Sequence, residues 1–147
     1  MTLSATPATI LLIEDDIPFA ATLQHWIARL WPNSQIRLCA TLASTAQYLA
    51  KATPDFVVAD LRLPDSTNPQ ATCASLVEML PPLTPVMVVS GYCPKVEQIT
   101  YLAMGVNACL SKSADIQFFP ALLDLASTAW AQQRGIERRL SLSKQES

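Results

Sequence analysis

Residues 56–65 read Phe-Val-Val-Ala-Asp-Leu-Arg-Leu-Pro-Asp. Four apolar residues are followed directly by an acid, Asp60, and the more polar stretch after it contains Pro64. A short, continuous apolar run of this kind is typical of a strand that is covered on both faces, as in a parallel sheet. The segment therefore predicts a buried strand that ends at a carboxylate.

Similar apolar runs lie on both sides of this strand, at residues 9–13, 35–39, 85–89 and 108–111. Between the runs, apolar residues recur with the spacing of one helix face at residues 19–30, 42–49, 73–80 and 96–103. Pro69 suits the first turn of the third of these helices, and Gly105 suits the end of the fourth. A last helix follows Asp115, with Pro120 in its first turn or with its start near Phe119.

The stripe expected to face the core in the fourth helix consists of Val96, Ile99, Leu102 and Ala103. Five alternating strand and helix segments predict one α/β domain with a doubly wound, five-stranded parallel sheet and helices on both faces. Right-handed crossovers place the carboxyl ends of all five strands along one edge. Ligands bind at that edge, near the point where the strand order reverses, so we expect the chemistry there.

Four of the five predicted strands end in polar residues, namely Glu14-Asp15-Asp16, Asp60, Ser90 and Ser111-Lys112. Clustered carboxylates repel one another, and a bound cation relieves that repulsion. Carboxylate and carbonyl oxygens favour a hard ion such as Mg²⁺. A carboxylate beside Mg²⁺ can attack phosphorus to form an acyl phosphate, while a lysine and a hydroxyl bind the phosphoryl oxygens. The set therefore indicates metal-assisted phosphoryl transfer to Asp60.

Four strings resemble the signature segments of response-regulator receiver domains: ILLIEDD (residues 10–16), VVADLRLPD (57–65), VMVVSG (86–91) and ACLSK (108–112). The order and spacing of the segments are also similar to those of the family. The resemblance implies the flavodoxin-like strand order 2-1-3-4-5 and a receiver domain at residues 8–130. Residues 131–147 are then the end of the last helix and a polar tail, or a truncated linker to an absent output domain.

The resemblance also implies a function and the residues that carry it. Asp60 matches the phosphoacceptor, Ser90 the switch hydroxyl and Lys112 the phosphate-binding lysine. A protein of this kind takes a phosphoryl group from a sensor histidine kinase or a phosphotransfer protein and turns over no external substrate. Its role is that of a signalling switch in a two-component phosphorelay.

The metal site that the resemblance implies holds Mg²⁺. Glu14 and Asp15 match the acidic pair of the family, in which Asp15 binds the ion directly and Glu14 acts through water. Asp60 is a further ligand, and Arg62 contributes its backbone carbonyl.

Two positions depart from the family pattern. Proline usually follows the lysine, often through a cis peptide bond, whereas this chain has Ser113. A cis bond before a residue other than proline costs about 3 kcal/mol, so we expect a trans bond and an altered approach of Lys112. Three residues before the lysine the family commonly has Tyr or Phe, which turns inward as the switch hydroxyl moves. Cys109 has no ring, so we expect that coupling to be absent or weakened, with Tyr92 as a candidate substitute.

Arg62 and Tyr92 occupy variable positions that resemble those flanking the path of the hydrolytic water. Because both side chains are bulky, our hypothesis is that they shield the acyl phosphate and make self-dephosphorylation slow.

Two other functions compete with the phosphoacceptor switch. A pseudo-receiver uses the same fold as a protein-binding module without phosphorylation, and Ser113 and Cys109 keep this alternative open. An aspartate-dependent phosphatase on a similar sheet uses a second acid two residues after its nucleophile. This chain has Arg62 there and so lacks the general acid of such an enzyme.

The composition and charge limit the binding partners and the cellular location that we expect for the protein. A formal net charge of −2 gives no electrostatic footprint for nucleic acid. The apolar runs are too short to cross a bilayer and the amino terminus lacks a signal peptide pattern, so we expect a cytoplasmic protein. The four cysteines form no CxxC pair, which argues against a zinc site.

Three aromatic residues near the last two helices are either packing residues or a homodimer surface, namely Tyr101, Phe118 and Trp130.

Overall fold

The computed structural model describes residues 7–128 and 130–132. Its five parallel strands form one sheet in the order β2-β1-β3-β4-β5. The strands are β1 (Thr9–Ile13), β2 (Gln35–Cys39), β3 (Phe56–Ala59), β4 (Val86–Ser90) and β5 (Ala108–Ser111). The doubly wound α/β fold and the strand order are therefore confirmed. One boundary differs, because β4 begins one residue later than expected and includes Ser90.

Helices connect successive strands, as expected. They are α1 (Ile17–Leu30), α2 (Leu42–Leu49), α3 (Pro69–Met79) and α4 (Lys95–Ala103). The side chains of Asp16 and Asn68 accept backbone N–H groups in the first turns of α1 and α3, which fixes where these helices begin. After α4 the chain turns at Gly105, whose φ of 113° is a conformation that glycine adopts without strain.

A short 3-10 turn, η1 (Ile116–Phe118), leads into the last helix, whose described residues are 119–128 and 130–132. This helix starts at Phe119 with Pro120 in its first turn, as predicted. Only residues 131 and 132 of the predicted tail are described, so the prediction for residues 133–147 lies outside the described residues. Among the helices that the structure describes, none has the length and apolar character that a bilayer span requires.

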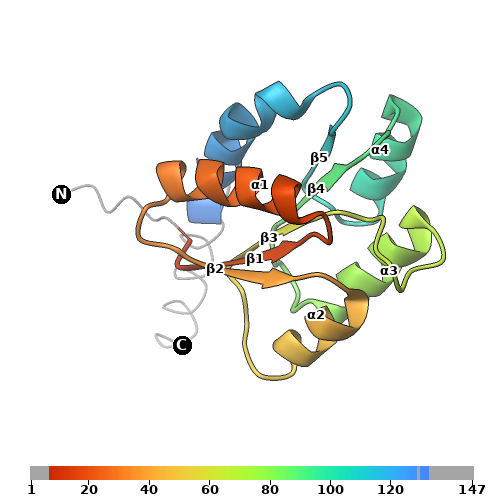
Figure 1. Ribbon diagram of the computed structural model, residues 1–147, viewed down its shortest axis with the longest axis horizontal. Helices are drawn as coiled ribbons and strands as arrows, with labels where there is room; N and C mark the ends of the chain where they lie inside the picture. The colour runs from red at the N-terminus through yellow and green to blue at the C-terminus, as the bar shows by residue number, and fades with distance from the viewer. Residues whose placement is uncertain (1–6, 129, 133–147) are drawn as a thin grey trace, which may run out of the picture.

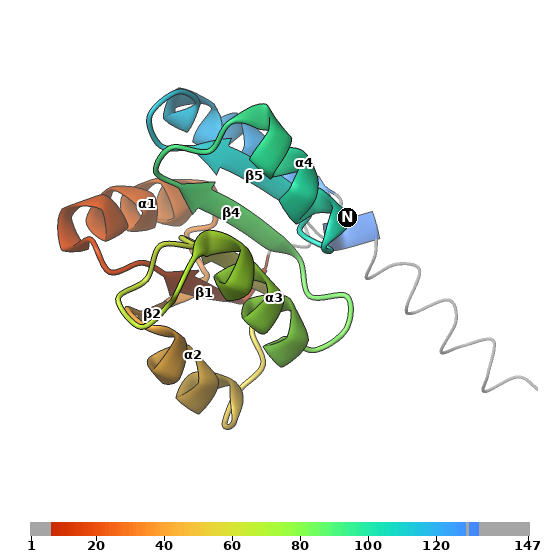
Figure 2. The same ribbon diagram turned by 90° about the vertical axis from the view of Figure 1, so that its right-hand side faces the viewer.

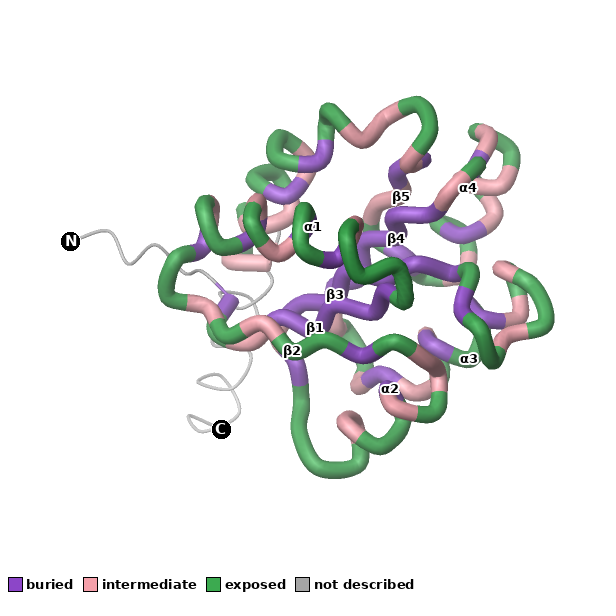
Figure 3. The backbone as a smooth tube through the Cα atoms, in the orientation of Figure 1, coloured by how far each residue is buried: buried purple, intermediate pink, exposed green. Residues whose placement is uncertain are grey.

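The helices cover both faces of the sheet (Figure 1). α1 and the last helix pack on one face, where Ile10 and Leu12 of β1 meet Leu23 and Phe119. α2, α3 and α4 follow one another along the other face (Figure 2). Alternate residues of each central strand point to opposite faces, and both sets are buried (Figure 3), which explains the continuous apolar runs.

The orientation of α4 differs from the sequence prediction. The stripe expected to face the core is largely exposed, with relative exposures of 76% for Val96, 66% for Ile99 and 44% for Leu102. Tyr101 is buried instead, at 1%. The helix was therefore predicted correctly and its buried face wrongly, since Tyr101 is the residue of α4 that packs into the core.

The three aromatic residues near the last two helices differ in how deeply they are buried. Tyr101 belongs to the core and is not part of an exposed surface, whereas Phe118 is exposed and Trp130 is partly buried. A homodimer through these helices stays a prediction, now with Phe118 as its one exposed aromatic residue among these three.

Candidate functional site

Three of the predicted site residues are held by backbone hydrogen bonds that continue the sheet by one residue beyond its strands. The N–H of Glu14 donates to Cys39 O at 3.0 Å, and that of Asp60 donates to Ile13 O at 2.8 Å. The N–H of Lys112 donates to Ser90 O at 2.7 Å. Because the sheet itself fixes these backbones, their side chains start from defined positions at its carboxyl edge.

The Asp60 carboxylate is almost fully buried and hydrogen-bonded through both oxygens. Its Oδ1 accepts from the Arg62 backbone N–H at 2.9 Å and from Ser90 Oγ at 3.2 Å. Its Oδ2 accepts from Lys112 Nζ at 2.9 Å. The residues predicted as phosphoacceptor, switch hydroxyl and lysine therefore lie in direct contact.

Lys112 also binds Glu14, so that one ammonium lies between two acids. Its Nζ donates to Glu14 Oε1, while Glu14 Oε2 accepts the backbone N–H of Asp15 at 3.1 Å. Burial raises the pKa of Glu14 to about 7, with Lys112 opposing the shift and Asp60 adding to it. Burial works against the charge of Lys112, but the hydrogen bonds to Glu14 and Asp60 outweigh it and raise the pKa of this lysine. Lys112 is therefore charged at neutral pH.

An aromatic ring completes the surroundings of Lys112. Its Nζ lies 4.2 Å from the ring centroid of Phe19 in the first turn of α1, within the range of a cation–π contact. The sequence did not predict this contact of Phe19. An apolar residue four positions after Asp15 carries no signal of its own, because its contact depends on how α1 lies over the sheet.

The spacing of the acidic oxygens can be compared with the ligand spacing that a small divalent ion requires. One carboxylate oxygen each from Glu14, Asp15 and Asp60 all lie within 4.8 Å of one another. Octahedral Mg²⁺ with bonds of about 2.1 Å spaces its ligand oxygens about 3 to 4.2 Å apart. The chemistry and closeness of these three carboxylates therefore fit such an ion. The ligand role of the Arg62 carbonyl stays a prediction.

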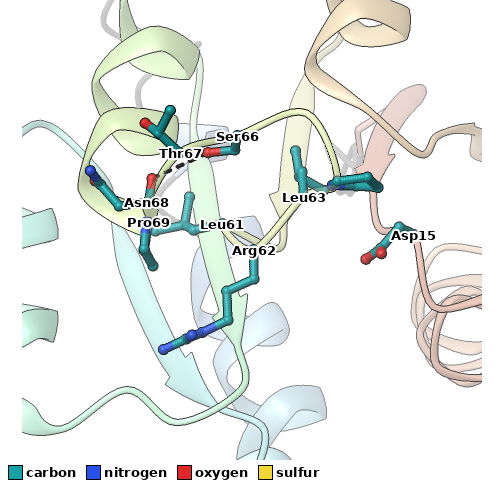
Figure 4. Close-up of a pocket in the computed structure, with 9 residues that line it drawn as sticks. Asp15, Leu61, Arg62, Leu63, Ser66, Thr67, Asn68 and Pro69 are labelled. Carbon is teal, nitrogen blue, oxygen red and sulfur yellow. Dashed lines mark hydrogen bonds between the residues drawn. The ribbon is translucent and has the colours of Figure 1, made fainter.

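A pocket of about 360 Å³ opens beside this edge, lined by Asp15 and by residues 61–64 and 66–69 (Figure 4). The Arg62 side chain is exposed and extends away from Asp15 in Figure 4. Asp65, in the same loop, accepts the backbone N–H groups of Leu42 and Ala43 at 2.9 Å each. The loop after Asp60 is therefore tied to the first turn of α2, a contact that could not be predicted from the sequence.

The two departures from the family pattern have clear structural consequences. No described peptide bond is cis, so the Lys112–Ser113 bond is trans, as expected for serine. Cys109 is partly buried, and burial raises the pKa of its thiol to about 12. Tyr92 is 70% exposed, so its ring does not take the inward position that the family's aromatic residue reaches.

The comparisons with known proteins agree with this arrangement. The family model described as response regulator receiver domain matches residues 10–124. No curated protein matches the chain.

Many solved structures share the fold. The non-phosphorylated HemR receiver domain from Leptospira biflexa is 22% identical with a TM-score of 0.68, over 82% of this chain and 94% of that one. NtrX from Brucella abortus is 16% identical with a TM-score of 0.75, over 89% of this chain and 29% of that one. A response regulator protein from Burkholderia pseudomallei, with a phosphorylated aspartic acid and a calcium ion, is 20% identical with a TM-score of 0.65, over 88% and 74%.

Proposed function

This chain belongs to the response regulator receiver family, and from that membership and the site geometry we propose that it is a phosphoacceptor switch. Receiver domains work in two-component systems with kinase partners. The proposed donor is the phosphohistidine of a sensor histidine kinase or of a phosphotransfer protein, and the proposed acceptor is Asp60. One observation carries the proposal: Lys112 Nζ and Ser90 Oγ lie 2.9 Å and 3.2 Å from the two oxygens of the Asp60 carboxylate.

In the proposed step, a carboxylate oxygen of Asp60 forms a bond to phosphorus while the bond from phosphorus to the donor's imidazole nitrogen breaks. The electron pair of the broken bond stays on the imidazole, and an acyl phosphate forms on Asp60. Charge on the transferring oxygens is best stabilised by donors that are already in place. Lys112 offers a fixed ammonium and Ser90 a hydroxyl, and both lie beside the carboxylate before any phosphoryl group arrives.

We propose that Mg²⁺ binds beside Asp60, with Asp15 as a direct ligand, Glu14 acting through water and the Arg62 carbonyl as a further ligand. When bound, the ion neutralises charge on the phosphoryl oxygens. Three observations support this assignment. Both oxygens of Glu14 already accept hydrogen bonds, and the exposed Asp15 carboxylate is open to an ion from solvent. The relative from Burkholderia pseudomallei carries a calcium ion together with its phosphorylated aspartic acid.

We further propose that the protein turns over no external substrate and acts in the cytoplasm. Arg62 stands where an aspartate-dependent phosphatase has its second acid, and its exposed side chain extends away from Asp15 (Figure 4). Without a general acid, hydrolysis of the acyl phosphate is not accelerated by the protein. A cytoplasmic location follows from the proposed donor, because sensor kinases transfer their phosphoryl group on that side of the membrane.

The test uses the full chain, Mg²⁺ and the small phosphodonor acetyl phosphate, with intact mass spectrometry as the readout. We expect the gain of one phosphoryl group, and no gain in Asp60→Asn or after chelation of the metal. Asp124→Asn, on the exposed face of the last helix, is the matched control and should still be phosphorylated. An unmodified wild-type protein, or a gain that persists in Asp60→Asn, would favour the pseudo-receiver, a binding module that works without phosphorylation.

A further inference from the structure

Two serine hydroxyls flank Lys112 in the sequence and lie against the chain that follows Ser90. Ser111 is buried at 2% exposure, and its Oγ donates to Gly91 O at 2.9 Å. Ser113 Oγ lies 2.9 Å from Ser111 Oγ. Ser111 is also the register partner of Ser90 in the β4–β5 pair. The two residues next to the lysine therefore contact the residue next to the switch hydroxyl.

The direction of these hydrogen bonds follows from counting hydrogens. A serine hydroxyl carries one hydrogen, and that of Ser111 goes to Gly91 O. Ser113 must therefore be the donor in the bond between the two hydroxyls. The backbone N–H of Ser113 also donates to Gly91 O, at 3.2 Å. Together with the bond from Lys112 N–H to Ser90 O, these contacts form what we call the serine clamp.

We propose that Ser111 and Ser113 are positioning residues that hold the Lys112 ammonium at Asp60, an inference that rests on the proposed function. A lysine side chain is long and flexible, so its ammonium reaches a fixed point only when the backbone below it is fixed. The serine clamp joins residues 111–113 to residues 90–91, so the two phosphate-binding groups, Lys112 and Ser90, keep one relative position.

The clamp depends on a departure of this chain from the family pattern. The proline that usually follows the lysine has no N–H and no hydroxyl. Neither the bond from Ser113 N–H to Gly91 nor the bond from its hydroxyl to Ser111 could form with proline at position 113. Ser113 thus provides two contacts that tie the loop to the sheet, where the family relies on the rigid proline ring.

The test measures the rate of phosphorylation of the full chain by acetyl phosphate in five variants: Ser111→Ala, Ser113→Ala, Ser113→Thr, Lys112→Ala and the double variant Ser111→Ala/Lys112→Ala. Loss of one well-placed hydrogen bond should slow the reaction about fivefold in each serine variant. In the Lys112→Ala background, Ser111→Ala should cause no further slowing, because no ammonium remains to be positioned. Ser113→Thr keeps the hydroxyl and should restore the wild-type rate.

Ser127→Ala is the matched control, since its hydroxyl donates to Asp124 O within the last helix, and its rate should not change. Equal slowing by Ser111→Ala with and without Lys112, or wild-type rates in both serine variants, would overturn the clamp. If the buried Ser111→Ala variant fails to fold, the exposed Ser113→Ala and Ser113→Thr pair decides the question.

A second readout separates this inference from the proposed function. Amide hydrogen exchange at Lys112 and Ser113, measured by NMR on the unphosphorylated protein, should become faster in Ser111→Ala and Ser113→Ala. If the wild-type protein accepts no phosphoryl group, the proposed function fails, and exchange alone then decides whether the clamp holds the Lys112 backbone. Unchanged exchange in both variants would show that it does not.

Discussion

The ammonium of Lys112 lies 2.9 Å from Oδ2 of Asp60, and it also donates to Glu14. One cation thus neutralises part of the charge of two buried acids, which would otherwise repel each other. The same ammonium is placed to meet the negative charge of an incoming phosphoryl group. The contact that stabilises the resting site is therefore also the contact that the proposed reaction uses.

Replacement of Lys112 by alanine should slow phosphorylation of Asp60 by about 10²-fold, because a preorganised charge is removed from the transferring oxygens. The rate with acetyl phosphate, followed by intact mass spectrometry, measures the effect. Lys95→Ala, an exposed lysine at the start of α4, should react like the wild-type protein. A Lys112→Ala variant that reacts at the wild-type rate would remove Lys112 from the proposed mechanism.

Replacement of Phe19 by leucine should slow the same reaction about two- to fivefold. Leucine keeps apolar bulk over Lys112 but lacks the ring face that attracts the ammonium at 4.2 Å. Phe19→Tyr retains that face and is the control. Equal rates in the leucine and tyrosine variants would mean that Phe19 contributes only packing.

Small residues at positions 62 and 92 should shorten the lifetime of the acyl phosphate. Both side chains are exposed and bulky, and the hypothesis is that they restrict the approach of water to Asp60. The lifetime is measured by removing the phosphodonor and following the loss of mass from Arg62→Ala, Tyr92→Ala and the double variant. Lifetimes equal to that of the wild-type protein in all three would refute the shielding hypothesis.

The two hydrogen bonds between Asp65 and α2 should make the stability of the folded state depend on pH under acidic conditions. Hydrogen bonds from the N–H groups of Leu42 and Ala43 lower the pKa of Asp65 below its ordinary value of 3.8. A lowered pKa means that the ionised form stabilises the folded state above about pH 4 and that this contribution is lost as the pH falls through the folded-state pKa. Asp65→Asn should therefore have a lower Tm than the wild-type protein at pH 7.

The difference in Tm should shrink as the pH falls below about 4, where Asp65 in the wild-type protein also loses its charge. Thermal unfolding followed by circular dichroism at several pH values measures it. Asp124→Asn controls for the change in net charge. A difference in Tm between the wild-type and Asp65→Asn proteins that stays constant down to pH 2 would contradict a stabilising role for ionised Asp65.

The strands and the site could be predicted from the sequence because each leaves a local trace. Strands buried on both faces need continuous apolar runs, so the limits of β1 and β3 could be seen directly in the sequence. The carboxyl ends of parallel strands share one edge, so Asp60 and Lys112, 52 positions apart, could be expected to meet. Their contact needed no knowledge of how the helices pack.

What the sequence could not predict depends on helix orientation and on side-chain hydrogen bonds. The apolar stripe of α4 suggested a buried face with Val96 and Ile99, but packing buried Tyr101 and left both exposed. The contact of Phe19 with Lys112 depends on where α1 lies over the sheet. The bond from Ser111 to Gly91 is one of several that a serine beside a turn can make, and spacing alone does not select it.

The backbone bonds that extend the sheet at Glu14, Asp60 and Lys112 make the site stiffer on one side than on the other. The half that would bind phosphate consists of strand ends and is preorganised before any ligand binds. The other half includes the exposed Asp15 carboxylate, where movement of the side chain costs less. An ion entering from solvent would therefore be accommodated by the compliant half, while the geometry of the reacting carboxylate stays unchanged.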